Sequence, residues 1–353
     1  MRRRTYSRRH VIKGASALAV TLYAAPVRAA APAATAVTPD LVAAARKEGK
    51  VVWYTSAEVQ VAERIAKAFE AAYSGIAIRV ERTGAERQFQ RIAQERASRV
   101  YAVDVVNSSD AAHFVAWKRD DVLAPYVPED VAKFYPAEHK DPDGLFATFR
   151  LYLSVIGYNT NLVKAEDGPK SFADLLDPKW KGKIVKAHPG YSGGIMTATF
   201  QMARDLGWDY FEKLAQQNVM QVQSAADPPR KLARGERAVM ADGADQQIFL
   251  LKDAGQPVEI VYPAEGAPLV VGPNGIFKSA PNPNAARLLQ SWLLSVEAQQ
   301  LVMDLAYRSV HPHAKERPGR TPLRDIKTMK DDPVAVEKES DAVKARYARI
   351  FRV

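Results

Sequence analysis

Short apolar runs alternate with amphipathic helices along most of this chain, and that alternation is the feature that most limits its fold. Residues 51–54 are typical of a buried strand, and the apolar residues of 61–72 recur at helical spacing. Further strands are predicted at 76–80 and 103–106, with a helix at 86–97 between them. Strands and helices that alternate at this spacing predict βαβ units and a parallel sheet covered on both faces.

A second set of similar units begins after residue 180. Its predicted strands are 183–186 and 238–241, and its predicted helices are 194–204, 209–216 and 246–252. The extended run 146–158 lies between the two sets, and 268–278, followed by a helix at 284–294, can cross back to the first set. We therefore predict an α/β fold of two lobes with a ligand cleft between them.

The same pattern sets the expected boundaries of the chain's parts. They are an export signal at 1–29, a spacer at 30–44, a first lobe at 45–150 and 263–328, and a second lobe at 151–262 and 329–353. The C-terminal helix expected at 334–350 is predicted to pack on the second lobe. A mature length of about 320 residues agrees with about two domains.

The chain begins with the features of an export signal. The pair Arg8 and Arg9 precedes the apolar stretch 15–25, and the small-residue segment 27–29 follows. This order is typical of a cleaved signal, and the arginine pair makes it resemble the twin-arginine type. A membrane anchor is the alternative, but the apolar stretch is far shorter than the roughly 20 residues that span a bilayer. The signal thus predicts a protein that works outside the cytoplasm.

Charge and cysteine content exclude several classes of function. The net charge of +10 falls to +3 without residues 1–29, which contain seven Lys or Arg and no Asp or Glu. A nucleic-acid binder needs a concentrated basic face, so we expect no nucleic-acid partner. The chain has no cysteine. Disulfides, iron–sulfur clusters, cysteine-ligated zinc and thiol nucleophiles are therefore excluded.

Polar loops follow five of the predicted strands. In open α/β sheets, ligands bind beyond the carboxyl ends of strands, where the free N–H groups of helix N-termini attract anions. The alternative for each loop is an N-cap that serves only its own helix. Because five such loops converge on one cleft, we predict ligand-binding residues among them. They are Ser56, Glu58, Thr83, Ser108, Ser109, Ser192, Gly193, Gly194, Asp242 and Asp245.

Two residues of the extended run complete the predicted site. The guanidinium of Arg150 and the ring of Tyr152 suit a small organic anion, such as a carboxylate or a phosphate or phosphonate compound. Gly193 and Gly194 would let that anion approach the backbone closely. For Arg150, the alternative is an ion pair with a surface acid.

Residues 171–184 carry a family resemblance. Their sequence, SFADLLDPKWKGKI, resembles the W-x-D-L-x-D-P-K-W-K-G-K-I passage of extracytoplasmic solute-binding proteins of ABC importers, in the branch that includes ferric-iron binders. Residues 158–160, 262–286 and 292–299 are also similar to that family, and the likeness covers residues 45–328. The resemblance implies a periplasmic monomer with a type II periplasmic binding fold that hands a small-molecule ligand to a membrane permease.

The resemblance also implies which ligands ferric iron would need. Iron-binding relatives carry adjacent tyrosines where this chain has residues 242–245, a histidine near Glu58 and a carboxylate near Ser109. We interpret these differences as the loss of direct ferric binding, and we predict neither a metal nor a cofactor. A ferric or ferric-chelate site built from Glu58, Asp242 and Asp245 remains an alternative.

Residues 190–194 also match the G-x-S-x-G pattern of serine hydrolases, and Asp245 and His311 follow in the hydrolase order. No oxyanion motif precedes them. The leading interpretation is therefore a binding protein without catalysis, and the alternative is an exported hydrolase that uses Ser192. A pure interaction protein is a third, less favoured interpretation, because the polar loops gather on one side of both sheets.

Overall fold

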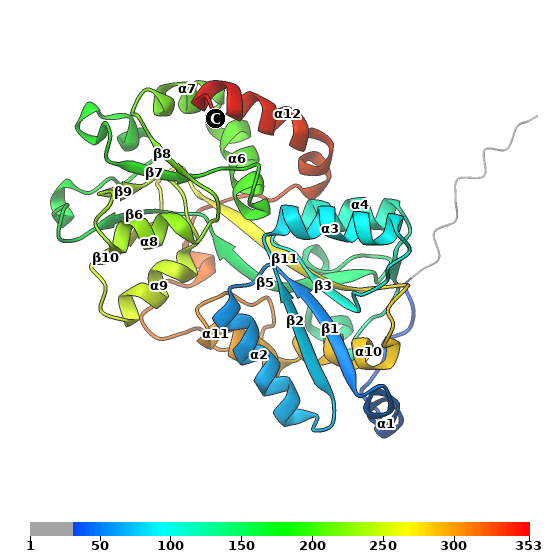
Figure 1. Ribbon diagram of the computed structural model, residues 1–353. Helices are drawn as coiled ribbons and strands as arrows, with labels where there is room; N and C mark the ends of the chain where they lie inside the picture. Colours follow the sequence, from blue (N-terminus) through cyan, green and yellow to red (C-terminus); the bar gives the residue numbers. More distant parts are fainter. Residues whose placement is uncertain (1–30) are drawn as a thin grey trace, which may run out of the picture. The chain divides into compact units, whose positions relative to one another are not determined.

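The computed structural model describes residues 31–353, so the predicted export signal at 1–29 lies outside the described residues. The strands form one sheet of seven and one sheet of five, each packed against helices (Figure 1). We call the part built on the seven-stranded sheet the first lobe and the part built on the five-stranded sheet the second lobe. No helix in residues 31–353 is both long and apolar enough to cross a membrane.

The first sheet has the strand order β12-β11-β3-β1-β2, and β4 and β5 also pair with β11. β1 runs parallel to both β2 and β3, whereas β11 is antiparallel to β3, β4 and β5. The parallel part is the βαβ arrangement that the sequence predicts. The strands are β1 (Lys50–Thr55), β2 (Ala77–Arg82), β3 (Val105–Asn107), β4 (Leu123–Ala124), β5 (Phe146–Leu153), β11 (Ala267–Phe277) and β12 (Thr328–Met329).

The second sheet has the strand order β10-β6-β9-β7-β8. β7 is parallel to β8 and β9, and β6 is antiparallel to β9 and β10. Its strands are β6 (Ile156–Asn159), β7 (Ile184–Ala187), β8 (Met220–Val222), β9 (Val239–Met240) and β10 (Val258–Val261).

The helices cover the sheets with their apolar faces. In α2 (Val59–Ala72), Val61, Ile65 and Phe69 are buried at a four-residue spacing, and the helix packs on β2. The other helices are α1 (Pro39–Glu48), α3 (Ala85–Ala97), α4 (Ala111–Arg119), α5 (Glu129–Phe134), α6 (Gly193–Leu206), α7 (Trp208–Ala215), α8 (Asp227–Ala233), α9 (Asp245–Asp253), α10 (Pro283–Leu293), α11 (Val296–Asp304) and α12 (Pro333–Phe351). Short 3₁₀ turns are found at Ala137–His139, Ala165–Asp167, Ala173–Leu176, Pro178–Trp180 and Leu323–Asp325.

Each lobe has its own aromatic core. In the first lobe, the rings of Trp53 and Phe149 meet edge to face with their centroids 5.8 Å apart. In the second lobe, Phe211 packs in the same way against Tyr210 at 5.3 Å and against Tyr347 of α12 at 6.1 Å. Burial of each large aromatic side chain contributes about 2–3 kcal/mol to stability, so each lobe has a substantial core of its own.

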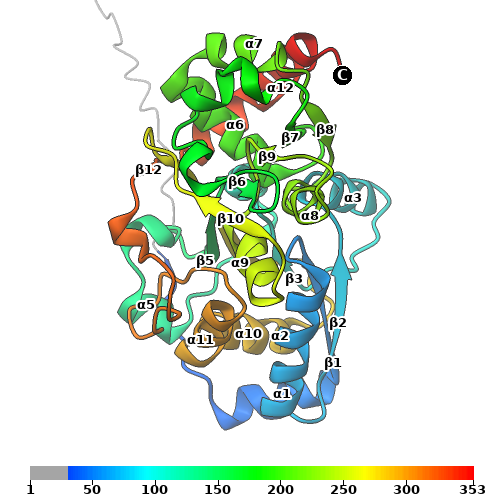
Figure 2. The same cartoon turned by 90° about the vertical axis from the view of Figure 1, so that its left-hand side faces the viewer.

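The chain passes between the lobes at three places. β5 ends at Leu153 in the first sheet and β6 begins at Ile156 in the second. After β10, the chain returns through β11, which pairs with β5 over most of its length. In Figure 2, the strands of the second sheet lie above β1, β2 and β3 of the first sheet. The chain leaves the first sheet again after β12 and enters α12. Loops at the carboxyl ends of strands in both sheets therefore face one cleft.

The predicted strands and helices are confirmed to within a few residues, as is the return of 268–278 to the first sheet. Two details differ. α1 begins inside the predicted spacer, where Thr38 caps the helix and Pro39 occupies its first turn. α12 packs on α6 and α7 of the second lobe, as predicted, but it also packs on α4 of the first lobe. The division of the chain between lobes at 150 and 151 stays a prediction, and that point falls inside β5.

Candidate functional site

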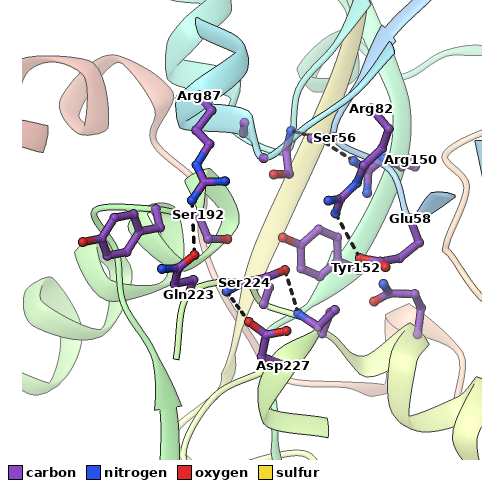
Figure 3. Close-up of a pocket in the computed structure, with 18 of the residues that line it drawn as sticks. Ser56, Glu58, Arg82, Arg87, Arg150, Tyr152, Ser192, Gln223, Ser224 and Asp227 are labelled. Carbon is purple, nitrogen blue, oxygen red and sulfur yellow. Dashed lines mark hydrogen bonds and ion pairs between the residues drawn. The ribbon is translucent and has the colours of Figure 1, made fainter. Parts of the chain in front are cut away.

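A cavity of about 210 Å³ opens between the two lobes (Figure 3). Pockets for drug-sized ligands begin at roughly 300 Å³, so this cavity suits a small metabolite. The loops after β1, β2 and β3 form one side, and the segments before α6 and after β8 form the other. The polar lining residues are Ser56, Glu58, Arg82, Arg87, Ser109, Arg150, Tyr152, Tyr191, Ser192, Gln223, Ser224, Asp227, Gln246 and Tyr307.

Ser56 is held as a hydrogen-bond donor to the cavity. Its Oγ accepts the backbone N–H of Ser109 at 2.8 Å and Nη2 of Arg150 at 2.9 Å. A hydroxyl oxygen has two lone pairs and one proton. Because both lone pairs are used by the protein, only the proton of Ser56 is left for a ligand, and it must be given to an acceptor.

Arg150 places a buried positive charge beside Ser56. The side chain extends from β5, its Nε donates to Oδ1 of Asn107 at 3.2 Å, and its guanidinium lies 4.7 Å from the ring centroid of Tyr307. Arg150 is only 2% exposed and forms no ion pair with a carboxylate in residues 31–353. A buried charge without a counter-charge is destabilising, so this guanidinium favours an anion in the cavity.

Five helices in residues 31–353 begin at the cavity without a side-chain cap. They are α2, α3, α6, α8 and α9, whose N-cap residues Glu58, Gly84, Ser192, Ala226 and Ala244 all line it. The alternative, in which a loop residue only caps its own helix, does not hold for the side chain of Ser192, which makes no cap hydrogen bond, whereas Asp110 caps α4 through the N–H of Ala112. Free N–H groups at helix N-termini attract negative charge, so they act in the same direction as Arg150.

Two buried phenols also line the cavity. Burial raises the pKa of both Tyr152 and Tyr307, against the opposing charge of Arg150. Both hydroxyls therefore keep their protons at neutral pH and act as neutral hydrogen-bonding groups rather than phenolates. Tyr191 is 47% exposed at the edge of the cavity.

The structure brings six of the twelve predicted site residues to the cavity. They are Ser56, Glu58, Ser109, Arg150, Tyr152 and Ser192. Thr83 lies next to the lining residues Arg82 and Gly84 but does not line the cavity itself. Ser108 is buried and bonds Nδ1 of His113 at 2.9 Å. It does not line the cavity.

The two glycines of the α6 turn approach protein atoms rather than open space. A Cβ at Gly193 would lie 2.6 Å from Cβ of Asp110, and one at Gly194 would lie 1.7 Å from the hydroxyl oxygen of Tyr152. These glycines therefore allow the two lobes to approach each other. Neither residue lines the cavity.

Asp242 and Asp245 do not line the cavity either, which corrects the expectation for both. Asp242 is buried against Lys186, with Oδ2 2.6 Å from Nζ. Asp245 is fully buried, and its Oδ2 lies 2.7 Å from Arg320 and 3.3 Å from Arg308. Each carboxylate is already paired with a buried cation, so neither is available to a ligand.

These contacts also show that neither of the two alternative sites is assembled. The proposed oxygen cluster for ferric iron is not assembled, because Glu58, Asp242 and Asp245 belong to three separate ion-pair groups. The hydrolase triad is not assembled either, since no hydrogen bond joins Ser192, Asp245 and His311 in residues 31–353. The nearest carboxylate to Nε2 of His311 is that of Asp130, at 3.6 Å.

A group with metal-ligand chemistry lies beside the cavity rather than in it. Ligand atoms of Glu86, Asp110 and His113 fall within 4.8 Å of one another. Nζ of Lys344 in α12 also contacts Glu86, at 2.8 Å. Burial alone would raise the pKa of Glu86, but the hydrogen bond and charge of His113, followed by Lys344, lower it to about 2. The group is thus explained as an internal ion network that joins the first lobe to α12.

Several lining residues were not predicted from the sequence. Arg82 and Arg87 flank a predicted loop, so their position could have been inferred. Residues 223–227 follow β8, a strand that was not predicted, although Ser224 and the Asp227-Pro228 pair are typical of a helix start. Gln246 directly follows the predicted loop 242–245, so its position could also have been inferred. Tyr307 has no local signal, because tertiary packing alone brings it to the cavity.

Comparison with known proteins agrees with this architecture. The family described as bacterial extracellular solute-binding protein matches residues 64–333. A putative 2-aminoethylphosphonate-binding periplasmic protein of Salmonella typhimurium is 29% identical over 248 residues, which is 66% of this chain and 69% of the relative. An uncharacterised protein of Haemophilus influenzae is 28% identical over 271 residues, 73% of this chain and 76% of the relative.

Solved structures show the same fold. The periplasmic binding protein AfuA of Actinobacillus pleuropneumoniae, with fructose-6-phosphate bound, has a TM-score of 0.79 and 26% identity over 87% of this chain and 99% of its own. Iron-bound HitA of Pseudomonas aeruginosa has a TM-score of 0.74 and 20% identity, over 85% of this chain and 99% of its own. At that identity the likeness to HitA concerns the fold alone.

The match covers most of the chain and confirms the family, the type II periplasmic binding fold with two α/β lobes, and the periplasmic location that the sequence predicts. The chain therefore belongs to the bacterial extracellular solute-binding proteins and is a periplasmic binding component of an ABC importer.

Proposed function

We propose that this protein captures a small organic anion with a phosphate or phosphonate group and delivers it to the permease of its importer without chemical change. The single observation that carries the proposal is the buried guanidinium of Arg150, which has no carboxylate partner in residues 31–353 and bonds the hydroxyl of Ser56. A bound oxyanion would supply the missing counter-charge and accept the proton of Ser56.

A phosphorus oxyanion uses this site more fully than a carboxylate does. The cavity offers the Ser56 proton, the Arg150 guanidinium and the N-termini of five helices that have no side-chain cap. Three oxygens around one phosphorus can accept from more of these donors than two carboxylate oxygens can. The phosphonate named for the Salmonella relative and the sugar phosphate bound to AfuA belong to the same chemical class.

We further propose that Ser56, Ser109, Arg150, Tyr152 and Ser192 contact the ligand, that the protein acts as a monomer, and that a twin-arginine signal exports it. Lobe closure around the ligand would present one state to the permease. The alternatives are a ferric or ferric-chelate binder and a hydrolase that uses Ser192. Both lack support in the cavity, because the carboxylates that they require are paired elsewhere.

A calorimetric titration of the protein from Ala30 tests the proposal. The ligands are phosphate, methylphosphonate, 2-aminoethylphosphonate, fructose-6-phosphate, acetate, citrate, ferric iron and ferric citrate. We expect binding by at least one phosphorus compound, at least a tenfold loss in Arg150→Gln and Ser56→Ala, and no change in Arg64→Gln, which removes an exposed charge of α2 outside the cavity. Binding of ferric iron alone, or an unchanged affinity in Arg150→Gln, would reject the proposal.

A further inference from the structure

The two acids that line the cavity are already engaged by arginines. Oε1 of Glu58 lies 3.4 Å from Arg82, and Oε2 lies 3.0 Å from Arg230. Asp227 accepts the backbone N–H of Ser224 at 2.8 Å, and its other oxygen lies 3.7 Å from Arg230. An ammonium group on a ligand would have to compete with these guanidiniums for both carboxylates.

Two arginines of the cavity have no such partner. In the part of the chain that the structure describes, Arg150 bonds only the neutral side chains of Asn107 and Ser56, and Arg87 of α3 donates to Oε1 of Gln223 at 3.2 Å. Neither guanidinium pairs with a carboxylate in residues 31–353. Figure 3 shows them in different parts of the cavity, with Arg150 beside Ser56 and Arg87 beside Gln223 and Ser192. The cavity thus carries two unbalanced positive charges at separate places.

We infer that the ligand carries a second anionic group at the end away from its phosphorus group, as a phosphonocarboxylate or a phosphorylated carboxylic acid does. This inference rests on the proposed function, in which Ser56 and Arg150 bind the phosphorus oxyanion. The second group, a carboxylate, then accepts from Arg87. An ammonium at this end would be repelled by Arg87, and a hydroxyl would leave the guanidinium without a counter-charge.

A second anionic group bound at Arg87 would also favour closure of the two lobes. The contact between Arg87 and Gln223 joins α3 of the first lobe to the loop after β8 of the second lobe. A carboxylate at this point accepts from Arg87 and can accept from the amide N–H of Gln223 as well. It therefore strengthens the contact between the lobes. Because Arg87 is exposed, the effect is moderate rather than large.

A matched pair of ligands tests this inference. In 3-phosphonopropionate and 2-aminoethylphosphonate, two methylenes separate the phosphonate from a carboxylate or from an ammonium group. We expect the wild-type protein to bind the carboxylate compound at least tenfold more tightly in calorimetric titrations. In Arg87→Gln this preference should fall below about threefold, while the affinity for 2-aminoethylphosphonate is unchanged or higher.

Two further variants separate this inference from the proposed function. Arg150→Gln and Ser56→Ala should lower the affinity for both compounds by similar factors, because the two compounds carry the same phosphonate group. The second anionic group is rejected if the wild type binds 2-aminoethylphosphonate as tightly as 3-phosphonopropionate, or more tightly. It is also rejected if the preference for 3-phosphonopropionate survives in Arg87→Gln. Neither result contradicts the proposed phosphonate site. If no phosphorus compound binds the wild type, the proposed function and this inference both fail.

Discussion

The hydroxyl of Tyr152 leaves no room for a side chain at Gly194, since a Cβ there would lie 1.7 Å from the phenolic oxygen. Tyr152 belongs to β5 of the first sheet, and Gly194 opens α6 beside the second sheet. The absence of a side chain therefore sets how closely the lobes approach at the edge of the cavity. The sequence predicts this glycine as a place for a ligand, but the ring of Tyr152 fills that space.

Gly194→Ala should separate the two lobes at this contact. The added methyl group must displace α6 or the buried ring of Tyr152, and such overpacking destabilises proteins by about 1–3 kcal/mol. We expect that loss in urea unfolding, together with at least a tenfold weaker affinity for the anion in calorimetry. The double variant Gly194→Ala with Tyr152→Phe removes the clashing oxygen and should regain part of the stability. A single variant with wild-type unfolding and affinity would contradict the assigned contact.

Glu58 joins the lobes, because Arg82 is its partner in the first lobe and Arg230 of α8 is its partner in the second. Glu58→Gln and Arg230→Gln should each weaken ligand binding by less than about tenfold. Their coupling in a double-mutant cycle should be about 0.5–1 kcal/mol, as for other partly exposed ion pairs. Arg64→Gln, which removes an exposed charge of α2 outside this ion-pair group, is the control and should show no coupling to Arg230→Gln. A loss above a hundredfold in Glu58→Gln alone would instead mean that Glu58 contacts the ligand, as the sequence predicts.

The buried pair of Lys186 and Asp242 stabilises the second lobe and should not affect ligand contact. Burial lowers the pKa of Lys186, and the nearby Asp242 carboxylate opposes that shift. Asp242→Asn removes the counter-charge but keeps an acceptor for the N–H of Ala187. We expect about 3 kcal/mol of lost stability in urea unfolding at pH 7 and a smaller loss at pH 10, where a neutral amine needs no partner.

A second variant completes this test. Lys186→Met added to Asp242→Asn removes both charges, so most of the lost stability should return. Ligand affinity of the folded protein should be the same in both variants and in the wild type. If folded Asp242→Asn binds the ligand more weakly than the folded wild type does, the predicted role of Asp242 in the site is supported.

Most of the fold could be predicted because its signals are local. The buried strand 51–54 and the four-residue spacing of Val61, Ile65 and Phe69 require only neighbours along the chain. α1 was missed because the Ala-, Pro- and Thr-rich segment before it is typical of a spacer. The Thr38-Pro39 start of that helix was nevertheless a usable signal.

The site could be predicted only in part, because strand ends locate loops but not the partners of each side chain. Ser56, Ser109 and Ser192 follow from the position of their loops. Asp245 occupies an equivalent loop, yet it is neutralised by Arg320, which lies 75 residues further along the chain. Pairing between such distant residues depends on tertiary packing, and no local pattern indicates it.

Asp331 makes the stability of the protein depend on pH. It lies between β12 and α12, and burial together with the charge of Asp110 raises its pKa to about 7. In the unfolded chain its pKa is near 3.9. Between these values the folded protein binds more protons than the unfolded chain, so this group's contribution to stability is present at about pH 4 and is lost as pH rises to about 7.

Asp331→Asn should abolish that loss. Because the carboxyl is partly exposed, solvent screening reduces the effect, and we expect the variant to gain about 2 kcal/mol over the wild type at pH 8 and nothing at pH 4. Glu86 does not disturb this comparison, since its pKa is lowered to about 2 and its contribution changes only below about pH 4.5. Urea unfolding at pH 4, 6 and 8 provides the measurement, with Glu63→Gln as a control that removes an exposed carboxylate of α2. Parallel pH profiles for Asp331→Asn and the wild type would show that Asp331 titrates normally in the folded protein.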